Sequence, residues 1–278
     1  MGKFDNILIV SDIDGTFLGK GGRIAERNIE KIKYFIAGGG RFTFATGRTV
    51  QNVKSLIPQL YEIVNAPAIL VNGTYFYDFA KQERSDEEFV DADLMRSLIK
   101  YVKKNYPGIE CRVSTRSGHI TDDASGPRLS RERARTTDGS FHVYPSGELP
   151  GNDWYKCVFR ADAKDNLRLR ADIEPKYRDA FTFFFSHPEI FELQKKGTSK
   201  GVKLKKLKKM YHDTGTELTV FAAGDFENDI EMLEAADVAV CPTNAMDRVR
   251  AIADISPCDN DEGLIAALIE VIEDKYIK

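Results

Sequence analysis

The chain has 278 residues, of which 42% are hydrophobic and 30% are charged, and its formal net charge is -3. The length suits two folded units or one large domain with an insertion, and the apolar content is sufficient for a sizeable core. Because the slightly acidic balance provides no global positive field, we expect neither nucleic acid nor an anionic membrane as a partner.

The cysteines and the amino-terminal segment indicate the compartment. The four cysteines lie far apart without a Cys-x-x-Cys pair, which favours reduced, structural thiols. The first residues lack the apolar core of a signal peptide, and no apolar run approaches membrane-spanning length. We therefore expect a cytoplasmic protein, either a monomer or a homodimer.

A buried strand followed by two carboxylates is the first predicted element. Residues 7–10 read Ile-Leu-Ile-Val, which is typical of a strand covered on both faces. Asp12 and Asp14 follow its carboxyl end, the edge of an open α/β sheet where ligands bind. An ordinary Asp/Gly turn would use the same residue types. Two crowded carboxylates repel each other, however, and oxygen ligands suit a divalent metal ion that would neutralise them.

Strands and helices then alternate along the chain. The next predicted elements are helices near 29–36 and 50–60 and strands at 41–45 and 68–71. This alternation implies right-handed βαβ units and a parallel sheet. From about residue 75 the pattern changes to mixed strands and helices with turn-rich joins, which predicts an α+β insertion. The alternating pattern resumes at Thr198 and continues to a terminal helix.

The predicted fold is therefore α/β, a doubly wound parallel sheet interrupted once by an inserted α+β domain. The predicted parts are the first core segment at 1–80, the insertion at 81–188 and the second core segment at 189–278. Within the insertion, 121–152 is polar and has no sustained period, so we expect a long loop there. The chain crossings at 78–83 and 186–192 are expected to be paired linkers that allow hinge motion.

Two further positions favour anion binding. Thr46 and Gly47 lie between a predicted strand and a helix, where a hydroxyl and exposed amides can hold phosphate oxygens. A plain N-cap threonine has the same arrangement without a ligand. Lys200 lies at a helix start, where its charge opposes the helix dipole and is better explained by an anion. The lysines from Lys203 to Lys209 are expected on the solvated outer side of this helix.

A third acidic segment follows the predicted strand 218–223. Residues 224–229 read Gly-Asp-Phe-Glu-Asn-Asp, so Asp225 stands at a strand end and Asp229 near a helix start. Acids at a helix start can simply favour the helix dipole. That explanation does not account for Asp225 at the same sheet edge as the first two carboxylates, where three acids would be costly without a cation.

These four segments resemble, in order, the four motifs of the haloacid dehalogenase superfamily, the aspartate-nucleophile phosphatases and phosphotransferases. Residues 12–16 read Asp-Ile-Asp-Gly-Thr, as in motif one, and 224–229 resemble motif four. Thr46 and Lys200 stand where the functional residues of motifs two and three should stand. The insertion between motifs two and three, together with Pro-Thr-Asn-Ala at 242–245, resembles the Cof-type, or type IIB, branch.

The resemblance implies a phosphatase that uses Mg2+ and acts on a small phosphorylated metabolite, such as a sugar phosphate. Asp12 would attack phosphorus to form an aspartyl-phosphate, and Asp14 would exchange protons with the leaving oxygen and with water. Asp14 would also contribute its main-chain carbonyl to the metal. The implied phosphate-binding residues are Thr46, Gly47, Lys200 and Asn228, and the implied metal ligands are Asp12, Asp14, Asp225 and Asp229.

Other functions remain open at this point. A carbon–halogen dehalogenase of the same superfamily would need neither Asp14 nor motif four. A phosphomutase or phosphotransferase has a similar insertion, and it differs in passing the phosphate to a second hydroxyl instead of water. A phosphorylatable receiver-like signalling module also uses clustered aspartates with lysine and threonine, but it lacks an insertion. A catalytically silent phosphate-binding protein would not need every motif residue.

Overall fold

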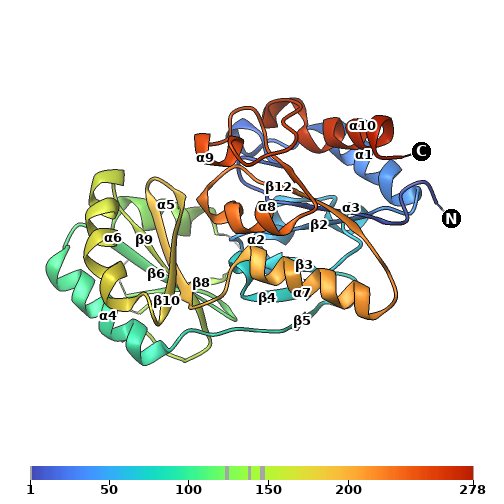
Figure 1. The fold of residues 1–278 in the computed structure, drawn as a ribbon. Helices are drawn as coiled ribbons and strands as arrows, with labels where there is room; N and C mark the ends of the chain where they lie inside the picture. The colour runs from blue at the N-terminus through green and yellow to red at the C-terminus, as the bar shows by residue number, and fades with distance from the viewer. Residues whose placement is uncertain (1, 123–124, 137–138, 145–147, 278) are drawn as a thin grey trace. The chain divides into compact units, whose positions relative to one another are not determined.

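The computed structural model describes residues 2–122, 125–136, 139–144 and 148–277, which form two compact units (Figure 1). The first unit comprises Met1–Arg48, Leu56–Asp86 and Ser199–Lys278. The second comprises Thr49–Ser55 and Glu87–Thr198. Among the described residues, none of the helices has the length and apolarity needed to cross a bilayer.

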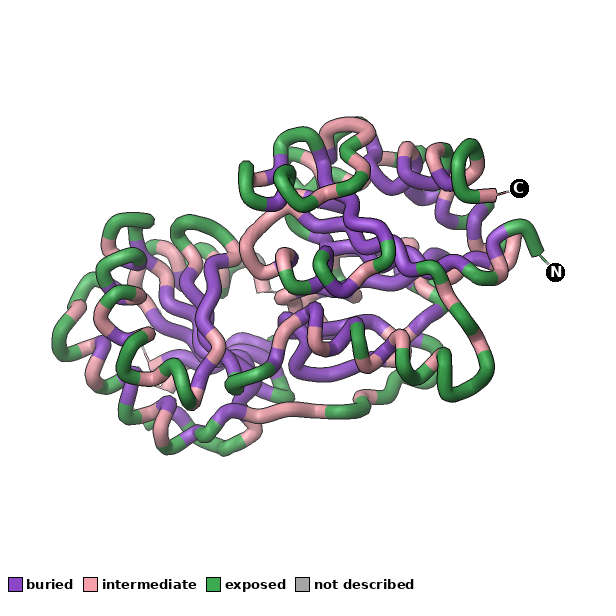
Figure 2. The backbone as a smooth tube through the Cα atoms, in the orientation of Figure 1, coloured by how far each residue is buried: buried purple, intermediate pink, exposed green. Residues whose placement is uncertain are grey.

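A parallel four-stranded sheet forms the centre of the first unit. Its strands, in spatial order, are β13 (Val238–Val240), β12 (Thr219–Ala223), β1 (Ile7–Ser11) and β2 (Arg41–Phe44). Nearly all of their residues are buried (Figure 2), which is why β1, β12 and β13 are largely apolar runs without alternation, while β2 reads Arg-Phe-Thr-Phe. An isolated parallel bridge from Ala45 to Ile69 joins this sheet to a small antiparallel one. The small sheet consists of β3 (Ala68–Leu70), β4 (Tyr75–Asp78) and β5 (Glu83–Ser85).

Helices cover the central sheet. Leu204 of α7 (Lys200–Asp213) and Leu233 of α8 (Ile230–Ala235) pack in one apolar cluster with Val10 and other strand residues. The helices α1 (Glu26–Ala37) and α10 (Leu264–Lys275) lie side by side (Figure 1). The shorter helical segments are η1 (Lys20–Gly22), α2 (Val50–Leu56), α3 (Leu60–Ile63), η2 (Val71–Gly73), η3 (Glu227–Asp229), α9 (Asp247–Arg250) and η4 (Asn260–Glu262).

The strand register aligns the carboxyl ends of β1, β2 and β12 at the same edge of the sheet. Ser11 of β1 pairs with Ala223 of β12 on one side and with Phe44 of β2 on the other. The residues that follow these three positions therefore leave the sheet at the same edge.

The second unit contains a six-stranded sheet in the order β10-β11-β9-β6-β7-β8, antiparallel except for the parallel pair β7 and β8. The strands are β6 (Glu110–Thr115), β7 (Gly118–Thr121), β8 (Phe141–Val143), β9 (Trp154–Arg160), β10 (Phe181–His187) and β11 (Ile190–Lys195). Its two long helices, α4 (Ala92–Asn105) and α6 (Ala163–Tyr177), are joined where Tyr101 donates a hydrogen bond of 2.7 Å to Asp172.

The predicted fold class is confirmed, because a parallel α/β sheet is combined with an inserted α+β unit. The division of the chain differs from the predicted boundaries, since the second unit consists of Glu87–Thr198 together with the short segment Thr49–Ser55. β5 stays with the first unit because it pairs with β4, and β11 stays with the second because it pairs with β10 and β9. The predicted linkers at 78–83 and 186–192 are therefore connections inside the two units.

The predicted loop at 121–152 contains the helix α5 (Pro127–Arg135) and the strand β8. Leu129 is buried within α5, while the helix is otherwise rich in Arg, Ser and Glu, so its sequence shows no apolar period. The carboxylate of Glu110 on β6 accepts hydrogen bonds from the main-chain N–H groups of Arg128 and Leu129 at the helix start. A carboxylate at this position satisfies free amides and favours the helix dipole.

Ion pairs hold the middle of α5. Glu132 lies 2.6 Å from Arg112 of β6 and 2.8 Å from Arg160 of β9, measured between side-chain oxygen and nitrogen atoms. These partners are far away along the chain, so a local pattern could not reveal the helix.

We predict that Leu129→Ala lowers the free energy of unfolding of the second unit by about 3 kcal/mol, because it leaves a cavity under α5. Urea unfolding followed by the fluorescence of Trp154, the single tryptophan, which lies in β9, reports on this unit. The matched control is Ser130→Ala, an exposed position on the same helix. Equal stability of the two variants would contradict the packing described for α5.

Candidate active site

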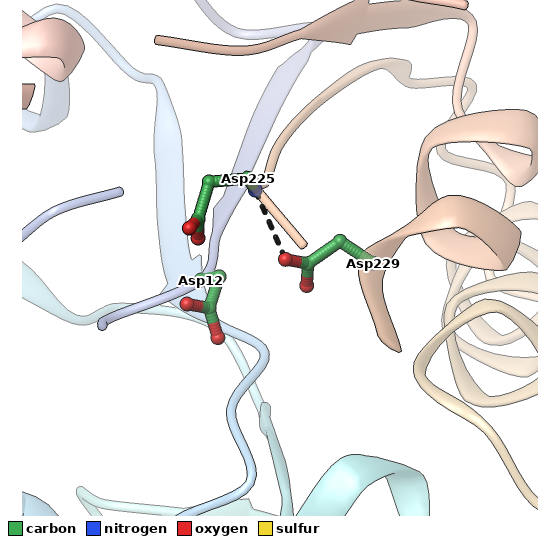
Figure 3. Close-up of side chains that lie close together, drawn as sticks. All are labelled: Asp12, Asp225 and Asp229. Atoms are coloured by element: carbon green, nitrogen blue, oxygen red, sulfur yellow. Dashed lines mark hydrogen bonds between the residues drawn. The ribbon is translucent and has the colours of Figure 1, made fainter. Parts of the chain in front are cut away.

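Three acidic residues meet at the carboxyl edge of the parallel sheet. Asp12 follows β1 and extends the ladder through a 2.8 Å hydrogen bond from its N–H to the carbonyl of Ala223. Asp225 follows β12, and Asp229 ends the turn η3. One carboxylate oxygen from each acid lies within 4.8 Å of the others, and Figure 3 shows the three side chains converging.

Two glycines allow this close approach. Gly224 lies so close to Asp229 that an added Cβ would stand 2.4 Å from the Cβ of that residue. Gly15 has a left-handed φ of 83°, and a Cβ there would lie 2.4 Å from a carboxylate oxygen of Asp225. Side chains at these positions would push the acidic segments apart, so both glycines of motifs one and four are required sterically.

Lys200 lies between two of the acids. Its ammonium is 2.5 Å from a carboxylate oxygen of Asp12 and 2.6 Å from one of Asp229, and the side chain is fully buried. The residue begins α7, where Ser199 caps the helix by accepting a 3.1 Å hydrogen bond from the N–H of Val202. A Cβ on Gly73 would lie 2.1 Å from the carbonyl oxygen of Ser199, so the chain after β3 packs directly against this helix start.

Asp229 organises the other two acids. One of its oxygens contacts Lys200, and the other accepts hydrogen bonds from the N–H groups of Asp225, at 3.0 Å, and Phe226, at 3.2 Å. The dashed line of Figure 3 marks the bond to Asp225. The hydroxyl of Thr16 donates to the Asp225 carboxylate at 3.0 Å, which links the segments that follow β1 and β12.

Burial and mutual repulsion shift the acid–base properties of the cluster. Burial raises the pKa of Asp12 well above its usual range, although the Lys200 ammonium opposes this rise. Burial and the Asp229 charge raise the pKa of Asp225 to about 7. Burial disfavours the charge of Lys200, but the carboxylates of Asp12 and Asp229 prevail and raise its pKa above the ordinary value. Full ionisation of the three acids would exceed the charge that Lys200 can neutralise, and the raised pKa values of Asp12 and Asp225 reflect this.

Asp14 lies apart from the cluster. Its carboxylate accepts two parallel hydrogen bonds from the guanidinium of Arg48, at 2.7 and 2.6 Å, and half of its side chain is exposed. Arg48 was not selected in the sequence because nothing marks it as a partner of a residue 34 positions earlier. The pair joins the segments after β1 and β2 at the surface of the site.

Thr46 and Asn228 reach the site from the carboxyl ends of two different strands, β2 and β12. Thr46 is buried after β2, and its hydroxyl accepts a 3.3 Å hydrogen bond from the N–H of Arg48. Asn228 in η3 donates a 3.1 Å hydrogen bond to the side-chain oxygen of Asn72. An added Cβ on Gly47 would lie 3.1 Å from the same Asn72 side chain, so Gly47, Asn72 and Asn228 are close neighbours.

The sequence analysis did not select Asn72. This buried residue follows β3 in a left-handed conformation with φ 55°, and its neighbours Val71 and Gly73 also have positive φ. Strained backbone of this kind clusters at functional sites. The Asn-Gly pair that ends a buried strand was the available signal, and the same pair is common in ordinary turns.

Comparison with known proteins identifies the family. Residues 9–269 match the family described as haloacid dehalogenase-like hydrolase. The chain belongs to this family. This match confirms the predicted family. Together with the relatives described next, it also confirms the predicted enzyme class, a phosphatase.

Several known proteins resemble the chain along most of its length. An "HMP-PP phosphatase" of Yersinia pseudotuberculosis is 27% identical over 246 residues, which cover 87% of this chain and 86% of the relative. A HAD/COF-like hydrolase from Plasmodium vivax has a TM-score of 0.83 at 23% identity, covering 98% of this chain and 96% of that one. A sugar phosphatase of HAD subclass IIB has a TM-score of 0.77 at 18% identity, covering 96% and 99%. Both structures share the fold of this chain.

The raised pKa of Asp225 predicts a pH-dependent stability of the metal-free protein. The folded state holds this proton more tightly than the unfolded state, so its contribution to stability is present below about pH 4 and is lost as the pH rises past about 7. Asn cannot ionise, so its contribution does not change with pH. With a chelator present, we expect the free energy of unfolding of Asp225→Asn to rise relative to that of the parent by roughly 2 kcal/mol from about pH 5 to about pH 8. Differential scanning calorimetry measures this difference, and a pH-independent difference would contradict the assigned pKa.

Proposed function

We propose that this protein is a magnesium-dependent phosphatase that hydrolyses a small phosphorylated metabolite through an aspartyl-phosphate on Asp12. The observation that carries this proposal is the buried cluster of Asp12, Asp225 and Asp229 around Lys200. Three carboxylates face a single ammonium there, and a divalent cation would restore the balance of charge.

The donor set supports Mg2+ in particular. All three side chains of the cluster offer carboxylate oxygens, which are the ligands that Mg2+ prefers. We assign Asp12, Asp225 and the main-chain carbonyl of Asp14 as its holders. Asp229 completes the acidic set, and its two hydrogen bonds to main-chain N–H groups keep the Asp225 segment in place. When bound, Mg2+ supplies positive charge that screens the Asp12 carboxylate from an anionic substrate.

In the proposed first step, a carboxylate oxygen of Asp12 attacks phosphorus and the bond from phosphorus to the leaving oxygen breaks. Lys200 contacts Asp12 and keeps the carboxylate in place at the strand end. Asp14 gives a proton to the leaving oxygen. Because the Asp14 carboxylate is paired with Arg48, we infer that it leaves this partner and takes up a proton from solvent before it meets the leaving group.

In the second step, water attacks phosphorus of the aspartyl-phosphate, Asp14 takes a proton from this water, and phosphate leaves with Asp12 restored. The phosphoryl oxygens are proposed to contact the Thr46 hydroxyl, the Gly47 N–H, Lys200 and the Asn228 amide. These groups are held in place before the substrate arrives, so little reorganisation is needed to stabilise the charge of the transition state.

The names of the relatives support a proposal for the substrate class. One of them is named for HMP-PP and another is called a sugar phosphatase, so we propose a small phosphomonoester, such as a sugar phosphate. Phosphate release should be measured over a panel of sugar phosphates, nucleotides, pyridoxal phosphate and HMP-PP. Transfer of the phosphoryl group to a second sugar hydroxyl, instead of to water, would identify a phosphomutase.

Replacing the nucleophile tests the covalent step. We expect Asp12→Asn to lower kcat by at least about 1,000-fold, because an amide of the same shape cannot attack phosphorus. Phosphate release from p-nitrophenyl phosphate measures the loss, and circular dichroism checks the fold. The conservative control is Asp237→Asn, an acid of the first unit that pairs with Lys208 on the protein surface. Activity of Asp12→Asn near the parent level would overturn the assigned role.

Removal of divalent ions tests the metal. We expect exhaustive chelation to abolish phosphate release and added Mg2+ to restore it, since the acidic cluster repels an anionic substrate without a cation. Mg2+ should also raise the melting temperature of the parent protein, by a few degrees at saturation, and have a smaller effect on Asp225→Asn. Full activity in the chelator would contradict the metal dependence.

A further inference from the structure

A short segment that follows motif two is attached to the second unit. Thr49–Ser55 belongs to that unit, although the residues on either side of it, Arg48 and Leu56, belong to the first. The segment contains all of α2 except its last residue. It directly follows Thr46 and Gly47, which are proposed above to contact the phosphoryl oxygens. What holds α2 therefore also affects the segment 46–48.

Hydrogen bonds make the start of α2 continuous with this segment. The carbonyl of Thr49 accepts a 3.0 Å hydrogen bond from the N–H of Val53, and its hydroxyl accepts one of 3.4 Å from the N–H of Asn52. Thr49 and Val53 are buried. Asn52 is thus one helical turn away from Arg48, and a contact made by its side chain is transmitted to the residues before the helix.

A histidine of the six-stranded sheet reaches this side chain. His119 of β7 is 3% exposed, and its Nε2 lies 3.3 Å from the Oδ1 of Asn52. Its Nδ1 lies 3.2 Å from Nη1 of Arg112 and 3.2 Å from the hydroxyl of Ser114. Both of these residues are on β6, where Ser114 pairs directly with His119. Each nitrogen of the imidazole therefore has a polar neighbour.

These neighbours determine which nitrogen carries the proton. A guanidinium only donates hydrogen bonds, so the Nδ1 that faces Arg112 must be the accepting nitrogen. The proton is then on Nε2, which donates to the Oδ1 of Asn52. Burial and the charge of Arg112 lower the pKa of His119 well below its ordinary value, so the ring is neutral at neutral pH.

Arg112 is itself held from the other side. Its Nε lies 2.6 Å from a carboxylate oxygen of Glu132 on α5, and its Nη1 donates a 2.9 Å hydrogen bond to the hydroxyl of Ser114. The contacts therefore run from Glu132 through Arg112 and His119 to Asn52. Each member orients the next, because donors and acceptors alternate along the chain.

We propose that His119 is a positioning residue for the segment 46–48, which it holds in place through Asn52 and α2. Apolar contacts alone leave a short helix free to shift or rotate slightly. The hydrogen bond selects one arrangement, because leaving the buried Nε2–H of His119 without an acceptor would be costly. The consequence for turnover rests on the phosphatase function proposed above.

Two amide substitutions separate the two sides of the ring. The amide nitrogen of Gln can replace Nε2, whereas the shorter Asn reaches only the position of Nδ1. His119→Gln therefore keeps a donor for Asn52, and His119→Asn loses it. Hydrogen–deuterium exchange of peptides covering 46–56 should become about fivefold faster in His119→Asn and stay within about twofold of the parent in His119→Gln. Any other order of the two variants would overturn the proposal.

Removing the acceptor guards against a folding defect in His119→Asn. Asn52→Ala deletes the same hydrogen bond from a partly exposed position and should accelerate exchange at 46–56 to a similar extent. Because both changes break one bond, the double variant should exchange no faster than either single variant. Independent, multiplying effects of the two substitutions would contradict the contact.

The proton position can be observed directly by NMR of 15N-labelled histidine rings. The signal that disappears in His119→Gln identifies this residue among the four histidines. At pH 7 we expect its proton on Nε2 alone. A proton on Nδ1, or on both nitrogens, would overturn the assigned hydrogen bonds.

Turnover separates positioning from direct contact with substrate. A displaced segment 46–48 should impair every phosphate ester alike, so we expect His119→Asn to lower kcat/KM roughly three- to tenfold across the substrate panel. His119→Gln should recover most of this loss. The matched control is His142→Gln, an exposed histidine on β8, which should match the parent.

A loss confined to one substrate, or one without faster exchange at 46–56, would overturn the positioning role. Absence of phosphatase activity in the parent would instead reject the proposed function, and the exchange and NMR results would still decide whether His119 holds α2.

Discussion

The contact of one buried ammonium with two carboxylates holds the candidate site together. Lys200 reaches both Asp12 and Asp229 from the first residue of α7, and this placement depends on the close packing of Gly73 against Ser199. Breaking such a contact by removing one partner leaves a buried charge uncompensated, which typically costs several kcal/mol. The helix start, the end of β1 and the turn η3 are therefore fixed together by electrostatics, not only by apolar packing.

Three ionised carboxylates would exceed the single positive charge of Lys200 at this site. Burial alone would favour protonated carboxylates, and the raised pKa of Asp12 and of Asp225 expresses that tendency. Such destabilised groups belong to functional sites more often than to purely structural ones. The protein thus maintains, at a cost in stability, a site that binding of a cation would improve.

The parts of the fold that follow from local pattern could be predicted, and the parts that depend on distant partners could not. The buried strands β1 and β12 are largely apolar runs, and an acid follows each of them within two residues, so the sequence placed Asp12 and Asp225 at strand ends. The helix α5 was missed because its stabilising partner Glu110 lies on another strand. The pair of Asp14 with Arg48 was missed for the same reason.

The two residues that flank the inserted segment 87–198 both contact Lys203, Asp86 through its carboxylate and Ser199 through its carbonyl. The insertion therefore begins and ends next to the same turn of α7. It lies between β5 and α7 in the chain, so it interrupts no strand of the parallel sheet. A segment with adjacent ends can be lengthened, shortened or exchanged without altering the sheet that receives it. The same catalytic scaffold could in this way acquire different inserted units in the course of evolution, while the charges at its strand ends stayed in place.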